Sequence, residues 1–322
     1  MNRDLIKAYI AWGNVCLFWG STYLAMRIGV AVFPPALFAG FRFAIAGLVF
    51  LAFLKFKGHA IPAWKDILDN AIVGIMLLVL ANGVVVWAEQ WVQSSLTALI
   101  LATVPFWMVG FEAILPGGDS LNFRKIFGII LGFIGLVQLL GPDLKASFDP
   151  HSFKGILALS FAACSWAAGS IFSKHHNTKT DPMMGAAIQM ISAAIILILV
   201  GVLWGEFSLL AFSWQGLGAL AYLIVFGSLV GYSSYIYALS KLPVSKLSMY
   251  AYINPVIAVV LGWLILDERF DAVMVTSTIM VLVGVVLVKT APTEVEKPVY
   301  STKPVMIAIG NIFRHKKRKV NP

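Results

Sequence analysis

The residues best suited to chemistry in this sequence are hydroxyl, amide and aromatic side chains that lie inside long apolar stretches. At membrane depth such groups bind a small solute and replace the water that the solute leaves behind. We therefore take them as candidates for binding a substrate in a central cavity. The candidates are Trp19, Thr22, Tyr23, Asn82, Trp87, Gln90, Thr103, Trp107, Trp166, Ser170, Tyr232, Tyr235, Tyr250 and Asn254.

The sequence offers no comparable candidates for catalysis. No group of Cys and His residues has the spacing of a metal site, and no glycine-rich phosphate loop precedes a predicted helix. We interpret the pair His175-His176 as solvated residues of a loop, and Cys16 and Cys164 lie in apolar stretches. We therefore expect no catalytic residue, no metal and no cofactor, and hence no enzymatic activity.

The composition places the candidate residues in a membrane. Of the 322 residues, 60% are hydrophobic and 12% are charged, and the mean hydropathy is +0.87. A soluble globule exposes too much of its surface to hide that much apolar area. The net charge of +9 comes from basic residues between the apolar stretches and in the tail. Because these residues form no RNA-binding motif, we expect no nucleic-acid partner.

The apolar stretches have about the twenty residues that a helix needs to cross a hydrocarbon core. We therefore predict an all-α membrane protein with ten transmembrane helices. Loop-forming pairs such as Pro34-Pro35 and Asp181-Pro182 separate them. The predicted spans are 8–31, 34–54, 68–88, 94–115, 123–141, 153–173, 182–204, 214–239, 244–266 and 270–289.

The distribution of Lys and Arg predicts how the chain is oriented. With the N-terminus inside, the inner segments hold 11 of these residues before the tail, and the outer segments hold five. Because positive residues favour the cytoplasmic side, we predict that both termini are cytoplasmic. The Asp143–Ser152 loop is then external, and residues 290–322 form a basic cytoplasmic tail. The expected location is the cell membrane, either a plasma membrane or a bacterial inner membrane.

The two halves of the chain match each other at a nearly constant offset. Trp19 and Trp166 lie 147 residues apart, and Pro105 and Pro255 lie 150 residues apart. Each half contains five predicted spans, so the second half is inserted upside down relative to the first. Inverted repeats of this kind are typical of secondary transporters, although a purely architectural duplication is the alternative. The two predicted repeats are 8–141 and 153–289.

Short motifs in both halves add to this pattern. The first half contains Phe18-Trp19-Gly20-Ser21 and Ala102-Thr103-Val104-Pro105, and the second contains Ala251-Tyr252-Ile253-Asn254-Pro255 and Asp267-Glu268-Arg269. Through these motifs the chain resembles the ten-helix permeases of the drug/metabolite transporter superfamily, which have paired EamA domains. That family often carries Gly-Glu-Arg after the fourth helix as well. Here the first copy is Gly117-Gly118-Asp119, so no role of that glutamate carries over to the first half.

The resemblance implies that helices one, three, four, six, eight and nine surround the cavity, while five and ten lie outside it. These inner helices carry no Lys or Arg at mid-depth, which predicts a neutral, zwitterionic or aromatic substrate. We assign Trp19 and Trp166 to the cavity. Trp12, Trp64 and Trp214 lie near predicted helix ends, where tryptophan anchors a protein at the lipid interface.

Four further residues bear on mechanism. Pro105 and Pro255 each free a backbone carbonyl inside a predicted helix, and each is either a hinge or a static kink. Glu89 is the candidate for proton coupling. Arg42 lies well inside the second predicted span, where a central charge costs about 3 kcal/mol. We therefore expect Arg42 either to pair or to extend outward to water.

Together these patterns predict a secondary transporter, most simply an exporter, that works by alternating access. Its substrate would be a small organic metabolite or drug, such as an amino acid or an aromatic compound. A metabolite channel is the nearest alternative, and a membrane enzyme or lipid-handling protein is the third. The expected partners are the substrate, the lipid bilayer and a coupling ion, with the chain acting as a monomer or weak dimer.

Overall fold

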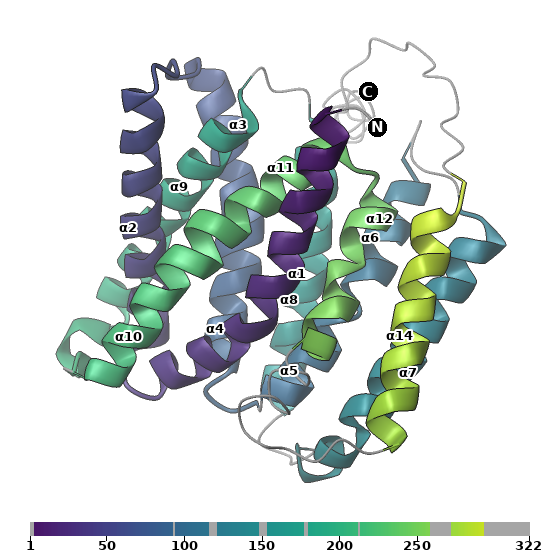
Figure 1. Ribbon diagram of the computed structural model, residues 1–322. Coiled ribbons are helices and arrows are strands. Elements are labelled where there is room, and N and C mark those ends of the chain that lie inside the picture. The colour runs from purple at the N-terminus through teal and green to yellow at the C-terminus, as the bar shows by residue number, and fades with distance from the viewer. Residues whose placement is uncertain are drawn as a thin grey trace, which may run out of the picture.

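The structure, a computed structural model, is a bundle of helices (Figure 1). It describes residues 3–92, 94–115, 121–147, 153–176, 180–211, 213–257 and 272–292, and these contain no β-strand. The Gly117-Gly118-Asp119 and Asp267-Glu268-Arg269 motifs lie outside the described residues, as does nearly all of the predicted tail.

Helices lie along the predicted spans, with one marked difference. Helix α7, along the fifth predicted span, continues through Gly141 and Pro142 to Ser147, so the predicted external loop begins later than Asp143. Residues 250–257 are also helical. The helices are α1 (Arg3–Val30), α2 (Pro35–Phe56), α3 (Trp64–Gly74), η1 (Ile75–Gly83), α4 (Val84–Ala88), α5 (Ser94–Leu101), α6 (Val104–Ala113), α7 (Phe123–Ser147), α8 (Phe153–His175), α9 (Pro182–Leu203), η3 (Glu206–Leu209), α10 (Trp214–Tyr222), η4 (Leu223–Tyr232), α11 (Ser233–Lys241), α12 (Val244–Ser248) and α14 (Ala272–Thr290).

Five helical stretches in the described part of the chain are long and apolar enough to cross a membrane. Many large apolar side chains on them, such as Leu48 and Ile195, are exposed. Lipid covers such side chains in a membrane, because hydrocarbon tails are as apolar as leucine. The five stretches are Pro35–Phe56, Trp64–Ala88, Phe153–His175, Pro182–Leu203 and Trp214–Lys241.

Prolines and acidic groups set the starts of α2 and α9. Each helix has a proline in its first turn, where a missing backbone N–H costs nothing. The Asp181 side chain accepts hydrogen bonds from the first backbone N–H groups of α9. At α2 the same role falls to Glu206, whose carboxylate accepts from the backbone N–H of Leu37 at 2.8 Å. A negative group at a helix N-terminus satisfies free donors and opposes the helix dipole.

Two helix pairs flank the bundle, with α1 and α8 between them (Figure 1). The pair α2–α9 forms one flank and the pair α7–α14 forms the other. The backbones of α7 and α14 approach closely at Gly128 and Gly284, where an added Cβ on Gly128 would lie 2.8 Å from the Gly284 carbonyl oxygen. The free end of α1 at Arg3 and the end of α14 at Thr290 lie at the same end of the bundle (Figure 1).

Two helices contain π-helical segments at matching places in the two halves. The segment η1 joins α3 to α4, and η4 joins α10 to α11. Side chains of other helices donate hydrogen bonds to backbone carbonyls of these segments. Ser165 donates to the Met76 carbonyl at 2.9 Å, and the Trp19 indole N–H donates to the Gly227 carbonyl at 3.1 Å. π-Helical turns are rare and concentrate at functional sites.

Pro105 lies at a break in the fourth predicted span. The helix α5 ends at Leu101, and Pro105 occupies the first turn of α6. The hydroxyl of Thr103 does not bond to the carbonyl freed by Pro105, that of Leu101. Thr103 donates instead to the Ile100 carbonyl at 2.6 Å, because a threonine hydroxyl reaches back three or four residues along its own chain.

Pro255 lies within a helical stretch, residues 250–257. The neighbouring Asn254 is buried, and its amide is assigned in the orientation in which the nitrogen donates to the carbonyls of Tyr250 and Cys16, each at 3.0 Å. The carbonyl that Pro255 frees, that of Ala251, is therefore not the partner of this amide. Asn254 instead ties this helix to α1.

Candidate functional site

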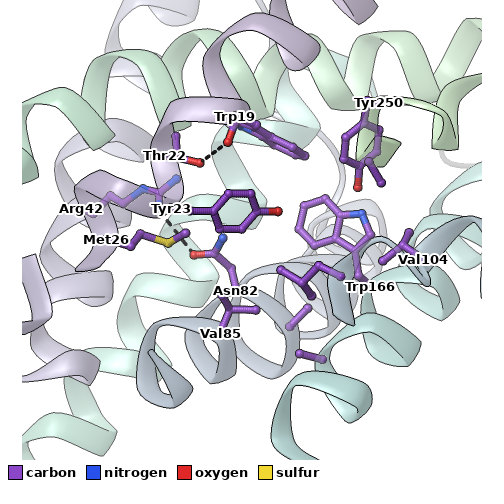
Figure 2. Close-up of a pocket in the computed structure, with 14 residues that line it drawn as sticks. Trp19, Thr22, Tyr23, Met26, Arg42, Asn82, Val85, Val104, Trp166 and Tyr250 are labelled. Atoms are coloured by element: carbon purple, nitrogen blue, oxygen red, sulfur yellow. Dashed lines mark hydrogen bonds between the residues drawn. The ribbon is translucent and has the colours of Figure 1, made fainter. Parts of the chain in front are cut away.

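A cavity lies in the middle of the bundle, where α1 presents one face (Figure 2). Trp19, Thr22, Tyr23 and Met26 follow the three-to-four-residue spacing of one helix face, so all four reach the same space. The cavity volume is about 70 Å³. The other helices contribute Arg42, Ala81, Asn82, Val85, Leu101, Val104, Ala162, Trp166, Tyr250 and Ala251.

Aromatic rings form much of the cavity wall. The rings of Trp19 and Trp166, matched residues of the two halves, meet edge to face with centroids 5.3 Å apart. Tyr250 meets Trp19 edge to face at 5.4 Å, and Tyr235 stacks on Trp19 at 5.3 Å from behind the wall. Each such pair stabilises its arrangement by about 0.5–1.5 kcal/mol beyond the area that it buries. The wall is therefore rigid and mostly apolar.

Hydrogen bonds behind the wall hold these rings in place. The Tyr235 hydroxyl pairs with the Ser170 hydroxyl at 2.5 Å, and Ser170 also donates to the Trp166 carbonyl. The Tyr232 hydroxyl donates to the side-chain amide oxygen of Gln189 at 2.6 Å. We predicted that Ser170, Tyr232 and Tyr235 bind substrate directly, but these residues do not line the central cavity, because their polar groups are engaged with neighbouring helices.

Arg42 lies in the cavity wall, so of the two alternatives expected for it, partners inside the bundle hold and extension outward to water does not. Only 4% of the residue is exposed. Its Nε donates to the Ser228 hydroxyl at 2.8 Å, and its Nη1 donates to the Asn82 amide oxygen at 3.4 Å. The expectation of a cavity without a cation at mid-depth is also wrong, because α2 contributes to the wall and the resemblance had left that helix out.

Glu89 is fully buried directly after α4. Neither of its carboxyl oxygens has a hydrogen-bond partner among the described residues. On α1, Arg27 donates to the backbone carbonyl of Glu89, and Tyr23 is close enough to interact with the carboxyl group electrostatically. Tyr23 lines the cavity, whereas Glu89 does not.

The remaining predicted site residues lie away from the central cavity. Trp87 and Gln90 line a separate hollow together with Trp91 and Glu206. Thr103 is not in the cavity lining, and neither is Trp107, whose side chain is exposed and packs near Phe111.

The tryptophans assigned to the lipid interface separate into two groups. Trp64 and Trp214 are 71% and 79% exposed, as an anchor requires. Trp12 is half-buried instead, and its indole N–H donates to the Leu247 carbonyl at 3.1 Å. A tertiary hydrogen bond therefore holds Trp12 within the bundle.

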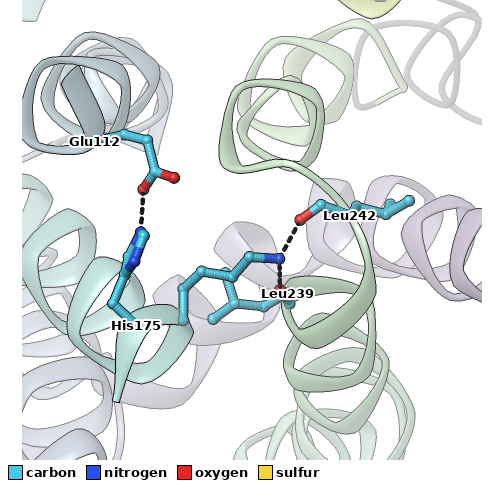
Figure 3. A network of polar contacts seen from close by, with 5 residues as sticks. Glu112, His175, Leu239 and Leu242 are labelled. Carbon is cyan, nitrogen blue, oxygen red and sulfur yellow. Dashed lines mark hydrogen bonds and ion pairs between the residues drawn. The ribbon is translucent and has the colours of Figure 1, made fainter. Parts of the chain in front are cut away.

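A polar network joins α6, α8 and α11 at the end of α8 (Figure 3). His175 Nε2 lies 2.9 Å from Glu112 Oε2, and the Lys174 ammonium donates to the carbonyls of Leu239 and Leu242. His176 Nε2 lies 2.9 Å from Asp69. His175 and His176, interpreted as solvated residues, have side chains that are 34% and 35% exposed, and each also contacts a carboxylate. No cluster of His, Cys, Asp and Glu in the described ranges could hold a metal ion.

Known proteins resemble this chain over most of its length. The EamA-like transporter family matches residues 8–141 and 153–290. The "Uncharacterized inner membrane transporter YedA" of Escherichia coli (strain K12) is 32% identical over 310 residues, which cover 95% of this chain and 97% of that protein. The "Uncharacterized transporter YoaV" of Bacillus subtilis (strain 168) is 23% identical, with coverage of 87% and 96%.

The fold also matches a solved structure. A protein crystal structure superposes with a TM-score of 0.73, covering 88% of this chain and 97% of its own. Its sequence is 22% identical, so this likeness concerns the fold alone.

Proposed function

Because the chain belongs to the EamA-like transporter family and is a multi-pass membrane transporter, we propose that it is a secondary carrier working by alternating access. It moves a small organic metabolite or drug across the cell membrane and acts as an exporter. Both termini lie in the cytoplasm. The observation that carries this proposal is the buried aromatic cavity, whose wall takes residues from both halves of the chain.

Two polar contacts, one at the end of α8 and one toward the end of α1, support alternating access. At one end His175 meets Glu112. Toward the other end of α1, Arg27 donates to the Glu89 carbonyl. Breaking one set while keeping the other would expose the cavity to one side at a time.

An inverted repeat provides the moving parts of this mechanism. The two halves supply the matched residues Trp19 and Trp166, and the π-helical segments η1 and η4 begin 148 residues apart. Two equivalent units that rock in turn give two mirror-related access states. Pro105 and Pro255 act as the hinges of these units, on opposite sides of the cavity.

Glu89 couples transport to protons in this proposal. A buried carboxyl group without hydrogen bonds favours its neutral form, because burial penalises the charge. Opening of the structure to water would favour the ionised form, so Glu89 would exchange a proton once in each cycle. Its electrostatic interaction with Tyr23 links that exchange to occupancy of the cavity.

Transport by purified protein in liposomes tests the function. A screen of amino acids, aromatic compounds and common drugs should yield at least one with saturable uptake that accelerates when the same compound is loaded on the opposite side. Linear, unsaturable flux would identify a channel instead. Chemical conversion of the compound would identify an enzyme.

A further inference from the structure

The charge of Arg42 has no counter-charge in the described part of the chain. Its hydrogen-bond acceptors, Ser228 and Asn82, are neutral, and it also packs against Gly227 and lies over the ring of Phe43 at 4.9 Å. The two acidic groups paired with histidine, Glu112 and Asp69, belong to other contacts. Together these observations leave the positive charge of Arg42 in the cavity wall without a counter-charge among the described residues.

A buried cation is costly unless a partner offsets it. A guanidinium group has five N–H donors in a planar fork that matches a carboxylate. Two of the Arg42 donors are used by Ser228 and Asn82, and the second of these bonds is long. The group therefore keeps donors free for a ligand.

A second donor lies in the same wall. The Trp166 indole N–H is buried and faces the hydroxyls of Tyr235 and Tyr250 without a well-formed hydrogen bond to either. Arg42 and Trp166 both line the cavity (Figure 2). A complementary ligand would supply acceptors to these donors and an apolar body to the rings between them.

We propose that Arg42 binds the carboxylate of the substrate, with Asn82 beside it, while Trp19, Trp166 and Tyr250 enclose a flat apolar body. The substrate class is thus a small organic acid or amino acid with a free carboxylate. This inference rests on the proposed carrier function and names the ligand of that same cavity. It predicts that the carboxylate, more than any amino group, decides binding.

Matched ligand pairs test the carboxylate directly in purified protein in detergent. The pairs are 3-phenylpropanoate with 3-phenylpropanamide, and phenylalanine with phenylalaninamide, with 2-phenylethylamine as the compound without a carboxyl group. Binding is measured by tryptophan fluorescence, because Trp19 and Trp166 line the cavity, and by the thermal shift of the protein. Each acid should bind roughly tenfold to a hundredfold more tightly than its amide, as expected for charge-assisted hydrogen bonds.

Arg42→Gln should remove the preference for acid over amide, and Arg42→Lys should retain part of it, because lysine keeps the charge without the planar fork. Lys55→Gln is the matched control, since it removes an exposed cation from the same helix. If Arg42→Gln does not fold, Arg42→Lys decides. It should weaken binding of the acids severalfold and change binding of the amides less than twofold.

The outcomes separate this inference from the transport function. Equal binding of acids and amides, no binding of either acid, or an acid preference that survives in both Arg42 variants would overturn the role of Arg42. Uptake of a compound without a carboxylate would still support a carrier in those cases. Acids that bind through Arg42 but are never transported would sustain the inference and refute the carrier. Tighter binding of phenylalanine than of 3-phenylpropanoate would assign the substrate to amino acids, and tighter binding of 3-phenylpropanoate would assign it to simple organic acids. Either result sustains the role of Arg42.

Discussion

Replacing Gly231 with alanine should displace the central tryptophan of the cavity wall. An added Cβ at Gly231 would lie 2.4 Å from Trp19 Nε1 and 2.8 Å from its Cδ1. Ordinary contacts of a Cβ begin near 3.4 Å, so the indole must move by about 1 Å. That shift disrupts its 3.1 Å hydrogen bond to the Gly227 carbonyl.

The cost of Gly231→Ala follows from three contributions. Loss of a buried hydrogen bond costs about 1–3 kcal/mol when a partner is left unsatisfied, and overpacking costs about 1–3 kcal/mol. The higher helix propensity of alanine returns about 1 kcal/mol. We expect a net destabilisation of about 1–5 kcal/mol and a loss of ligand binding in the cavity.

The matched control is Gly218→Ala in α10, where an added Cβ meets nothing within 4 Å. This variant should be as stable as the wild type or slightly more stable, since only the propensity gain remains. Thermal unfolding in detergent and tryptophan emission compare the two variants. If Gly231→Ala unfolds no earlier than Gly218→Ala and its emission is unchanged, Trp19 is not held as described.

Three further predictions concern coupling, motion and orientation. Glu89→Gln should abolish accumulation driven by a pH gradient in liposomes while substrate exchange continues; accumulation that still follows the gradient would rule out proton coupling at Glu89. Pro105→Ala and Pro255→Ala should each slow initial uptake severalfold at normal expression, because each restores a backbone donor and straightens its helix, and the double variant should be slower still. Wild-type rates in both single variants would identify static kinks. A Ser147→Cys probe, in a chain whose own cysteines are replaced, should be labelled from outside the cell, and labelling only from inside would reverse the predicted orientation.

The limits of the helices were largely predictable because local signals specify them. Pro35 and Pro182 begin α2 and α9 in the structure, as the loop-forming pairs before them indicated. The match between Trp19 and Trp166 was also visible in the sequence, and both line the cavity. The π-helical segments were not predicted, since their residues resemble those of any apolar α-helix.

The tertiary structure decided which face of each helix points inward. In a soluble helix the polar face marks the outside, but in lipid the outer and inner faces are equally apolar. The sequence therefore could not distinguish Tyr250, which lines the cavity, from Tyr235, which packs behind it. The sequence also could not place Arg42. A cation inside an apolar stretch either reaches water at the membrane surface or finds hydrogen-bond acceptors within the bundle. Only the packing of α2 beside η4, which brings Ser228 within hydrogen-bond distance, turns that charge toward the cavity.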